Sequence, residues 1–130
     1  MVGFCISGEP MTMCTVLVVD DDEIVRDSIA AMLSSLKHDV VQAKDGTEAF
    51  WVYKAMRDEI SIVVMDIKMP KMDGIEATKL IKELDPRARV ILTSGYSEKL
   101  PSNVKPSAFI AKPFTRLELG DIVQLVLKSA

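Results

Sequence analysis

The feature that most constrains the fold of this chain is a repeated alternation of short apolar runs with helix-period segments. Continuous apolar runs without polar alternation predict strands buried on both faces, as in a parallel sheet covered by helices. Strand–helix alternation of this kind predicts an α/β domain with right-handed crossovers. The five predicted strands are Thr15–Val19, Asp39–Ala43, Ile60–Met65, Arg89–Thr93 and Ala108–Ala111.

Helix-period segments follow four of these runs. The first places Ile24, Ile29 and Leu36 on one apolar stripe, which indicates an amphipathic helix. The other three are predicted at about Thr47–Arg57, Ile75–Leu84 and Arg116–Lys128. The connection between the fourth and fifth strands contains Pro101 and Pro106, so it is predicted to hold only one or two helical turns.

Length and composition predict one domain in a reducing compartment. A chain of 130 residues, 48% of them hydrophobic, holds one core, which we assign to residues 14–130 with residues 1–13 as an N-terminal extension. Both cysteines, Cys5 and Cys14, lie near the start, so a disulfide framework is not expected. No signal peptide is recognisable and no apolar run reaches the roughly 18 residues of a membrane span. We therefore predict a cytoplasmic protein.

The net charge of −3 argues against binding to nucleic acid or an anionic membrane surface, because both require a basic face. One histidine and two cysteines make a zinc site very improbable.

Polar residues occur at the carboxyl ends of the predicted strands, where α/β sheets carry their functional sites. Asp20 and Asp21 follow the first strand and Asp66 follows the third, while the next residue, Asp22, is interpreted mainly as a helix N-cap. Carboxylates this close raise one another's pKa or demand a cation, and oxygen ligands without nitrogen or sulfur favour Mg²⁺. Ser94 and Lys112, after the fourth and fifth strands, supply a hydroxyl donor and a counter-charge. This set predicts phosphoryl transfer in which an aspartate is the nucleophile.

Four segments of the chain form a recognisable pattern: Val16–Glu23 with Arg26, Met65–Gly74, Ile91–Tyr96 and Phe109–Phe114. The most specific part is the Asp-x-x-Met-Pro-x-Met-Asp-Gly run that begins at Asp66. Over about residues 15–128 the chain resembles the response-regulator receiver domain of two-component signalling. The resemblance implies a flavodoxin-like, doubly wound, five-stranded parallel sheet with strand order 2-1-3-4-5.

By the same resemblance, Asp66 is the phosphoacceptor and takes its phosphoryl group from a phosphohistidine of a sensor histidine kinase or phosphotransfer protein. The implied Mg²⁺ ligands are Asp20, Asp21, Asp66 and the backbone carbonyl of Lys68. Lys112 and Ser94 are implied to bind phosphoryl oxygens, and the Lys112–Pro113 bond is expected to be cis. Asp73 is expected to cap the helix that follows it.

The resemblance also implies a switch in which Ser94 moves toward the phosphoryl group and Phe109 turns inward, which changes a surface that binds a downstream protein. A plain core aromatic is the alternative interpretation of Phe109. The domain is expected to act as a signalling phosphoacceptor with weak self-phosphorylation and self-dephosphorylation rather than as an enzyme.

Spacing within the last third of the chain departs from the family. Ser94 and Lys112 are 18 positions apart, fewer than the resemblance leads us to expect, so the fourth helix of the family pattern should be short or distorted. Because that helix commonly contributes to the dimer or output face, the oligomeric state stays open.

Three other functions are compatible with parts of this pattern. A phosphatase of the haloacid-dehalogenase type needs a second acid two residues after its nucleophile, where Lys68 stands. A flavodoxin-like cofactor binder needs a phosphate cradle after the first strand, where the aspartates repel anions. A phosphorylation-independent interaction domain remains open. The sequence also leaves open the signal, the cognate kinase, the target, and whether the chain stands alone or is a receiver from a hybrid kinase.

Lys68 and Tyr96 occupy positions that, in the family, flank the path of the hydrolytic water. We predict that these two bulky side chains slow loss of the phosphoryl group by excluding water. Lys68→Asn and Tyr96→Ala should each accelerate dephosphorylation by more than about twofold, measured as the decay of the acyl phosphate. Unchanged decay rates in both variants would contradict the prediction.

Overall fold

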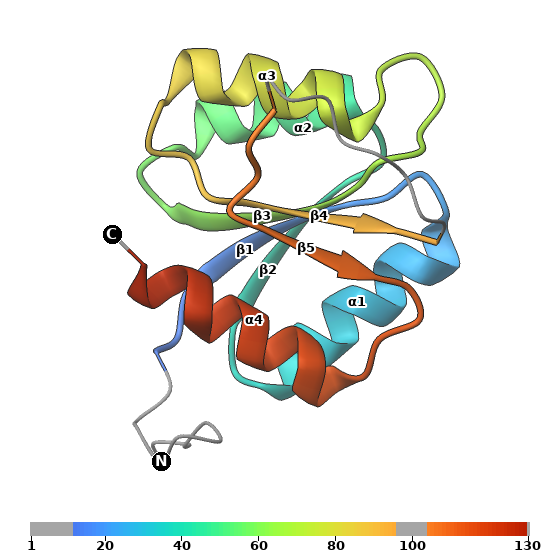
Figure 1. Ribbon diagram of the computed structural model, residues 1–130, viewed down its shortest axis with the longest axis vertical. Helices are drawn as coiled ribbons and strands as arrows, with labels where there is room; N and C mark the ends of the chain where they lie inside the picture. The colour runs from blue at the N-terminus through green and yellow to red at the C-terminus, as the bar shows by residue number, and fades with distance from the viewer. Residues whose placement is uncertain (1–11, 96–103, 130) are drawn as a thin grey trace.

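The computed structural model describes residues 12–95 and 104–129. Its centre is one parallel sheet in the order β2-β1-β3-β4-β5, with α2 and α3 covering one face and α1 and α4 the other (Figure 1). The strands are β1 (Thr15–Val19), β2 (Asp39–Ala43), β3 (Ile60–Asp66), β4 (Val90–Ser94) and β5 (Ala108–Ala111). The described helices are α1 (Glu23–Ser35), α2 (Gly46–Ala55), α3 (Gly74–Leu84) and α4 (Arg116–Lys128). The predicted fold class and strand order are confirmed.

Burial on both faces explains why the strands lack polar alternation. In β1, Leu17 and Val19 pack into the cluster under α2 and α3, whereas Val16 and Val18 pack into the cluster under α1 and α4. All four of these side chains are at most 1% exposed. Strands β1 to β4 therefore contribute side chains to the hydrophobic clusters on both faces of the sheet, whereas β5 contributes only to the cluster under α1 and α4. For β1 this double burial fixes the register, because a slip by one residue would exchange the two sets.

Side-chain caps fix where the helices begin. Asp22 accepts hydrogen bonds from the backbone of Ile24 and Val25, and Asp73 accepts one from Glu76, so both predicted N-caps are confirmed. Asp45 caps α2 in the same way, and Thr115 forms a capping box with Glu118 at the start of α4. These caps place the first turns of α1 and α3 directly behind the carboxyl ends of β1 and β3.

The connection between β4 and β5 lies mostly outside the described residues, including Tyr96 and Pro101. Its described part, residues 104–107, is not helical. The short or distorted helix expected there stays a prediction. The element labelled α4 is instead the helix predicted at Arg116–Lys128, after the fifth strand.

Residues 1–11 of the predicted N-terminal extension also lie outside the described residues. At its end, the Thr12 backbone exchanges two hydrogen bonds of 2.9 Å with the Gln124 side chain of α4. In the described part of the chain, no helix has the length and apolar character needed to cross a membrane.

Gly74 joins the loop after β3 to α3 in a space too tight for a side chain. Its N–H donates a 2.8 Å hydrogen bond to the Ile67 carbonyl, and an added Cβ would collide with the backbone carbonyl of Asp66. We predict that Gly74→Ala lowers the free energy of unfolding by about 1–3 kcal/mol, measured by urea denaturation. An added Cβ at Gly95 meets no described atom within 4 Å, so Gly95→Ala is the control. Equal losses in the two variants would contradict this account.

Candidate functional site

Three carboxylates meet at the carboxyl edge of the sheet. Asp20 follows β1 and Asp66 ends β3, and these two strands are neighbours in register. Oxygen atoms of Asp20, Asp21 and Asp66 all lie within 4.8 Å of one another. Asp20 and Asp66 are buried, at 1% and 8% exposure, whereas Asp21 is exposed. The structure therefore brings together the three acids predicted from the strand ends.

Local hydrogen bonds hold Asp20 in place. Its Oδ1 accepts a 2.9 Å hydrogen bond from the backbone N–H of Asp22, and its carbonyl accepts one of 2.9 Å from Arg26 Nη1. Arg26 also donates through Nε to Gln42 on β2. Arg26 was part of the recognised motif, but its role as a clamp on the turn after β1 was not predicted. Its position in the first turn of α1, close to the turn after β1, is the sequence feature that could have indicated this contact.

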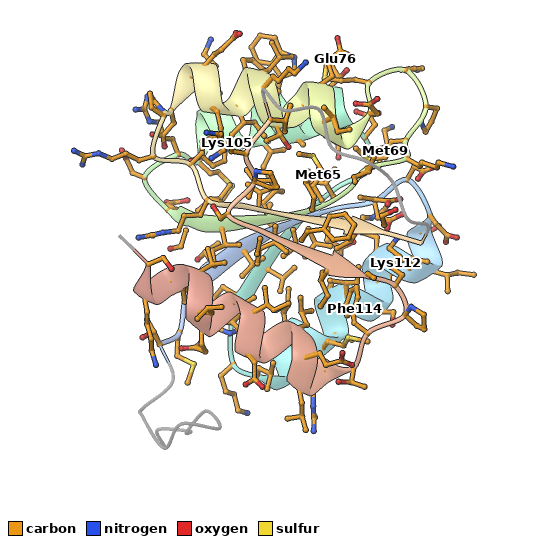
Figure 2. The ribbon with its side chains drawn as sticks, in the orientation of Figure 1. Met65, Met69, Glu76, Lys105, Lys112 and Phe114 are labelled. Carbon is orange, nitrogen blue, oxygen red and sulfur yellow. The ribbon has the colours of Figure 1, made fainter. Side chains whose placement is uncertain are left out.

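Lys112 follows β5, the edge strand of the sheet, and its side chain reaches this cluster. Its Nζ lies 2.9 Å from Asp20 Oδ2 and 3.5 Å from Asp66 Oδ1. The Lys112 N–H donates a 2.7 Å hydrogen bond to the Ser94 carbonyl, and the following Lys112–Pro113 bond is cis, as expected. In Figure 2 the labelled Lys112 lies near the carboxyl end of β5. One ammonium group thus balances two buried carboxylates from β1 and β3.

The cluster shifts the pKa of Asp66 and Lys112 upward. Burial is the largest cause for Asp66; the Lys112 charge opposes it, and the charges of Asp20 and Asp21 add to it. For Lys112, burial alone lowers the pKa, but the hydrogen bond and charge of Asp20, together with Asp66, outweigh burial and raise it. The site therefore favours a positive charge at the lysine and penalises the ionised form of Asp66.

The two predicted switch residues lie on the neighbouring strands β4 and β5, where Phe109 is in register with Leu92, two residues before Ser94. Ser94 is the last residue of β4 and is 2% exposed. Phe109 on β5 is 38% exposed and belongs to neither core cluster of the described residues, which argues against its interpretation as a plain core aromatic. Lys68 is exposed two residues after Asp66, and the role of its backbone carbonyl as a metal ligand stays a prediction.

The family model described as Response regulator receiver domain matches residues 16–124. The chain belongs to this family. Receiver domains are two-component phosphoacceptors, and the cluster around Asp66 fits their phosphorylation site. Membership sets aside the phosphatase and cofactor-binder alternatives.

Relatives of this receiver domain include proteins of two sizes. The chemotaxis protein CheY of Halobacterium salinarum is 39% identical, and the match covers 86% of this chain and 95% of that protein. The sensor kinase CckA of Brucella abortus is 34% identical over 88% of this chain but only 12% of the kinase. Among solved structures, the CheX–CheY–BeF₃–Mg²⁺ complex from Borrelia burgdorferi matches with a TM-score of 0.80 and 34% identity, over 95% of this chain and 93% of that one.

The raised pKa of Asp66 has a consequence for stability. Folding disfavours the carboxylate, so this cost is fully present above the raised pKa and disappears as the pH falls below the ordinary value of 3.8. We predict that Asp66→Asn increases the free energy of unfolding at pH 7, without divalent cations, by about 0.5–2 kcal/mol. The gain should shrink as the pH is lowered toward 4, as measured by denaturant titration at each pH.

The control for this prediction is Asp22→Asn, which keeps an N-cap residue and changes an exposed carboxylate outside the cluster. It should alter the stability by less than about 0.5 kcal/mol. A gain for Asp66→Asn that does not depend on pH would contradict the electrostatic explanation.

Proposed function

We propose that this receiver domain accepts a phosphoryl group on Asp66 from a phosphohistidine of a sensor histidine kinase or phosphotransfer protein. The observation that carries this proposal is the cluster around Asp66: oxygens of Asp20 and Asp21 lie within 4.8 Å of it, and Lys112 Nζ lies 3.5 Å from its Oδ1. A phosphoryl acceptor needs charge compensation for the incoming group, and the lysine beside Asp66, together with a cation held by the acids, can supply it.

The residues present fit Mg²⁺. Asp20, Asp21 and Asp66 offer carboxylate oxygens within 4.8 Å of one another, and the Lys68 backbone carbonyl is the fourth proposed protein ligand. Hard oxygen donors of this kind suit Mg²⁺, and the metal supplies charge neutralisation on the phosphoryl oxygens. A bound cation would offset the repulsion among the three carboxylates, which adds to the effect of burial in raising the pKa of Asp66.

Each side chain has a distinct role in the transfer. A carboxylate oxygen of Asp66 forms the new bond to phosphorus as the bond between phosphorus and the donor imidazole nitrogen breaks. Lys112 Nζ, held beside Asp66 by Asp20, pairs with one phosphoryl oxygen. The Ser94 hydroxyl donates a hydrogen bond to another. The same site hydrolyses the acyl phosphate slowly, so the domain is a signalling component with weak self-phosphorylation and self-dephosphorylation rather than an enzyme.

The output we propose is a changed protein-binding surface. Movement of Ser94 toward the phosphoryl group draws the half-exposed Phe109 ring inward and alters the face formed near β5. The CheY relative in complex with CheX supports a protein rather than a nucleic acid as the downstream partner. The relatives, a small CheY protein and a sensor kinase, support both a stand-alone regulator and a receiver of a larger kinase.

The proposal predicts that acetyl phosphate with Mg²⁺ adds one phosphoryl group to the wild-type chain and none to Asp66→Asn, as measured by intact mass. Asp22→Asn, which removes a charge from the same rim but from a capping side chain, should be modified like the wild type. Beryllofluoride with Mg²⁺ should shift the same set of amide resonances in the wild type and in Asp22→Asn. An adduct that survives Asp66→Asn, or no adduct in the wild type, would refute the assignment.

A further inference from the structure

One buried hydroxyl beside the site has no role in the mechanism above. Thr93 on β4 is 1% exposed, and its Oγ1 has no hydrogen-bond partner in the described part of the chain. Buried hydroxyls normally find a partner, because an unsatisfied polar group costs free energy. Thr78 is the contrasting case: it is equally buried, and its Oγ1 donates a 2.6 Å hydrogen bond to the Gly74 carbonyl.

The sheet register places Thr93 in the same row as Asp66. The two residues are register partners on β4 and β3, so their side chains lie on the same face of the sheet. Two residues earlier on each strand, Ile91 and Val64 both pack into the cluster under α1 and α4. Thr93 therefore faces α1 and α4, as Asp66 does.

The Lys112 side chain extends across the sheet next to the register pair of Asp66 and Thr93. It follows β5, and its Nζ reaches Asp66 on β3 and Asp20 after β1, so its side chain passes over the intervening strand β4. Thr93 is the last side chain of β4 on that face, because alternate residues share a face and the residue two positions on is Gly95. The unpartnered hydroxyl thus lies on the strand that the lysine spans.

The ammonium group of Lys112 has three protons and, among the described residues, two carboxylate acceptors. When Asp20 and Asp66 bind a cation and a phosphoryl group, they are less available to Lys112. The Lys112 side chain is 22% exposed, so without another acceptor the ammonium group can turn toward solvent.

We propose that Thr93 is a positioning residue: in the loaded site its Oγ1 accepts a hydrogen bond from Lys112 Nζ and keeps the ammonium group directed at the phosphoryl oxygen. This inference rests on the proposed function, and it adds a residue to which the family motif gives no role. The register partners of Thr93 are Asp66 on β3 and Ile110 on β5, so its hydroxyl lies between the site and the apolar cluster.

The test compares Thr93→Val, which keeps the shape and removes the hydroxyl, with Thr93→Ser, which keeps the hydroxyl. In the presence of Mg²⁺, Thr93→Val should bind beryllofluoride about tenfold more weakly than the wild type, whereas Thr93→Ser should stay within about twofold. The ¹⁵N signal of the Lys112 ammonium group in the beryllofluoride complex should be protected from exchange in the wild type and Thr93→Ser. It should be exchange-broadened in Thr93→Val.

Unfolding without ligands provides the structural control. Thr93→Val breaks no hydrogen bond in the resting state, so it should be at least as stable as the wild type, whereas Thr78→Val should be less stable. The inference is overturned if Thr93→Val binds beryllofluoride like the wild type with an unchanged ammonium signal, or if it loses as much stability as Thr78→Val. A wild type that takes neither beryllofluoride nor phosphoryl refutes the proposed function itself, which is a separate and recognisable result.

Discussion

The ion bridge from Lys112 to Asp20 and Asp66 is the interaction on which this site depends. Two carboxylates that are almost fully buried lie close enough to repel each other, and burial alone disfavours their charged forms. A single ammonium group at 2.9 and 3.5 Å offsets that cost. Because the lysine comes from the end of β5 and the acids from β1 and β3, the bridge also ties the late strand of the sheet to its centre.

The parallel sheet brings the two acids and the lysine to one edge. Parallel strands deliver all their carboxyl ends to one edge, and the order β2-β1-β3-β4-β5 places the two acid-bearing strands side by side. The double burial of β1 and β3 fixes their register, so Asp20 and Asp66 cannot slip apart without moving apolar side chains between the two cores. Packing energy from Val and Leu side chains therefore holds together charges that would otherwise separate.

The sequence predicts structure best where one residue type has one physical explanation. Apolar runs predict the strands, the acids at their ends predict the cluster, and Asp22 and Asp73 are predictable as caps because capping needs a short oxygen-bearing side chain at that place. The contacts of Arg26 and the proposed role of Thr93 are not predictable in this way, because they depend on which strands are neighbours and which face a side chain takes. The predicted helix between β4 and β5 stays untested, because residues 96–103 lie outside the described ones.

The charges at the site also indicate how the partners of Lys112 would change on phosphorylation. Lys112 pairs with Asp20 and Asp66, and burial, with the charges of Asp20 and Asp21 adding to it, still raises the pKa of Asp66. In the proposed function, a divalent cation held by the acids would leave Lys112 available to pair with a phosphoryl oxygen. Lys112 would then have carboxylate partners before phosphorylation and a phosphoryl partner after it. Such a site needs an acceptor that holds the Lys112 ammonium group while its partners change. In the described part of the chain, the only buried side-chain oxygen without a partner is Thr93 Oγ1, on β4, the strand between Lys112 on the β5 side and Asp66 on β3.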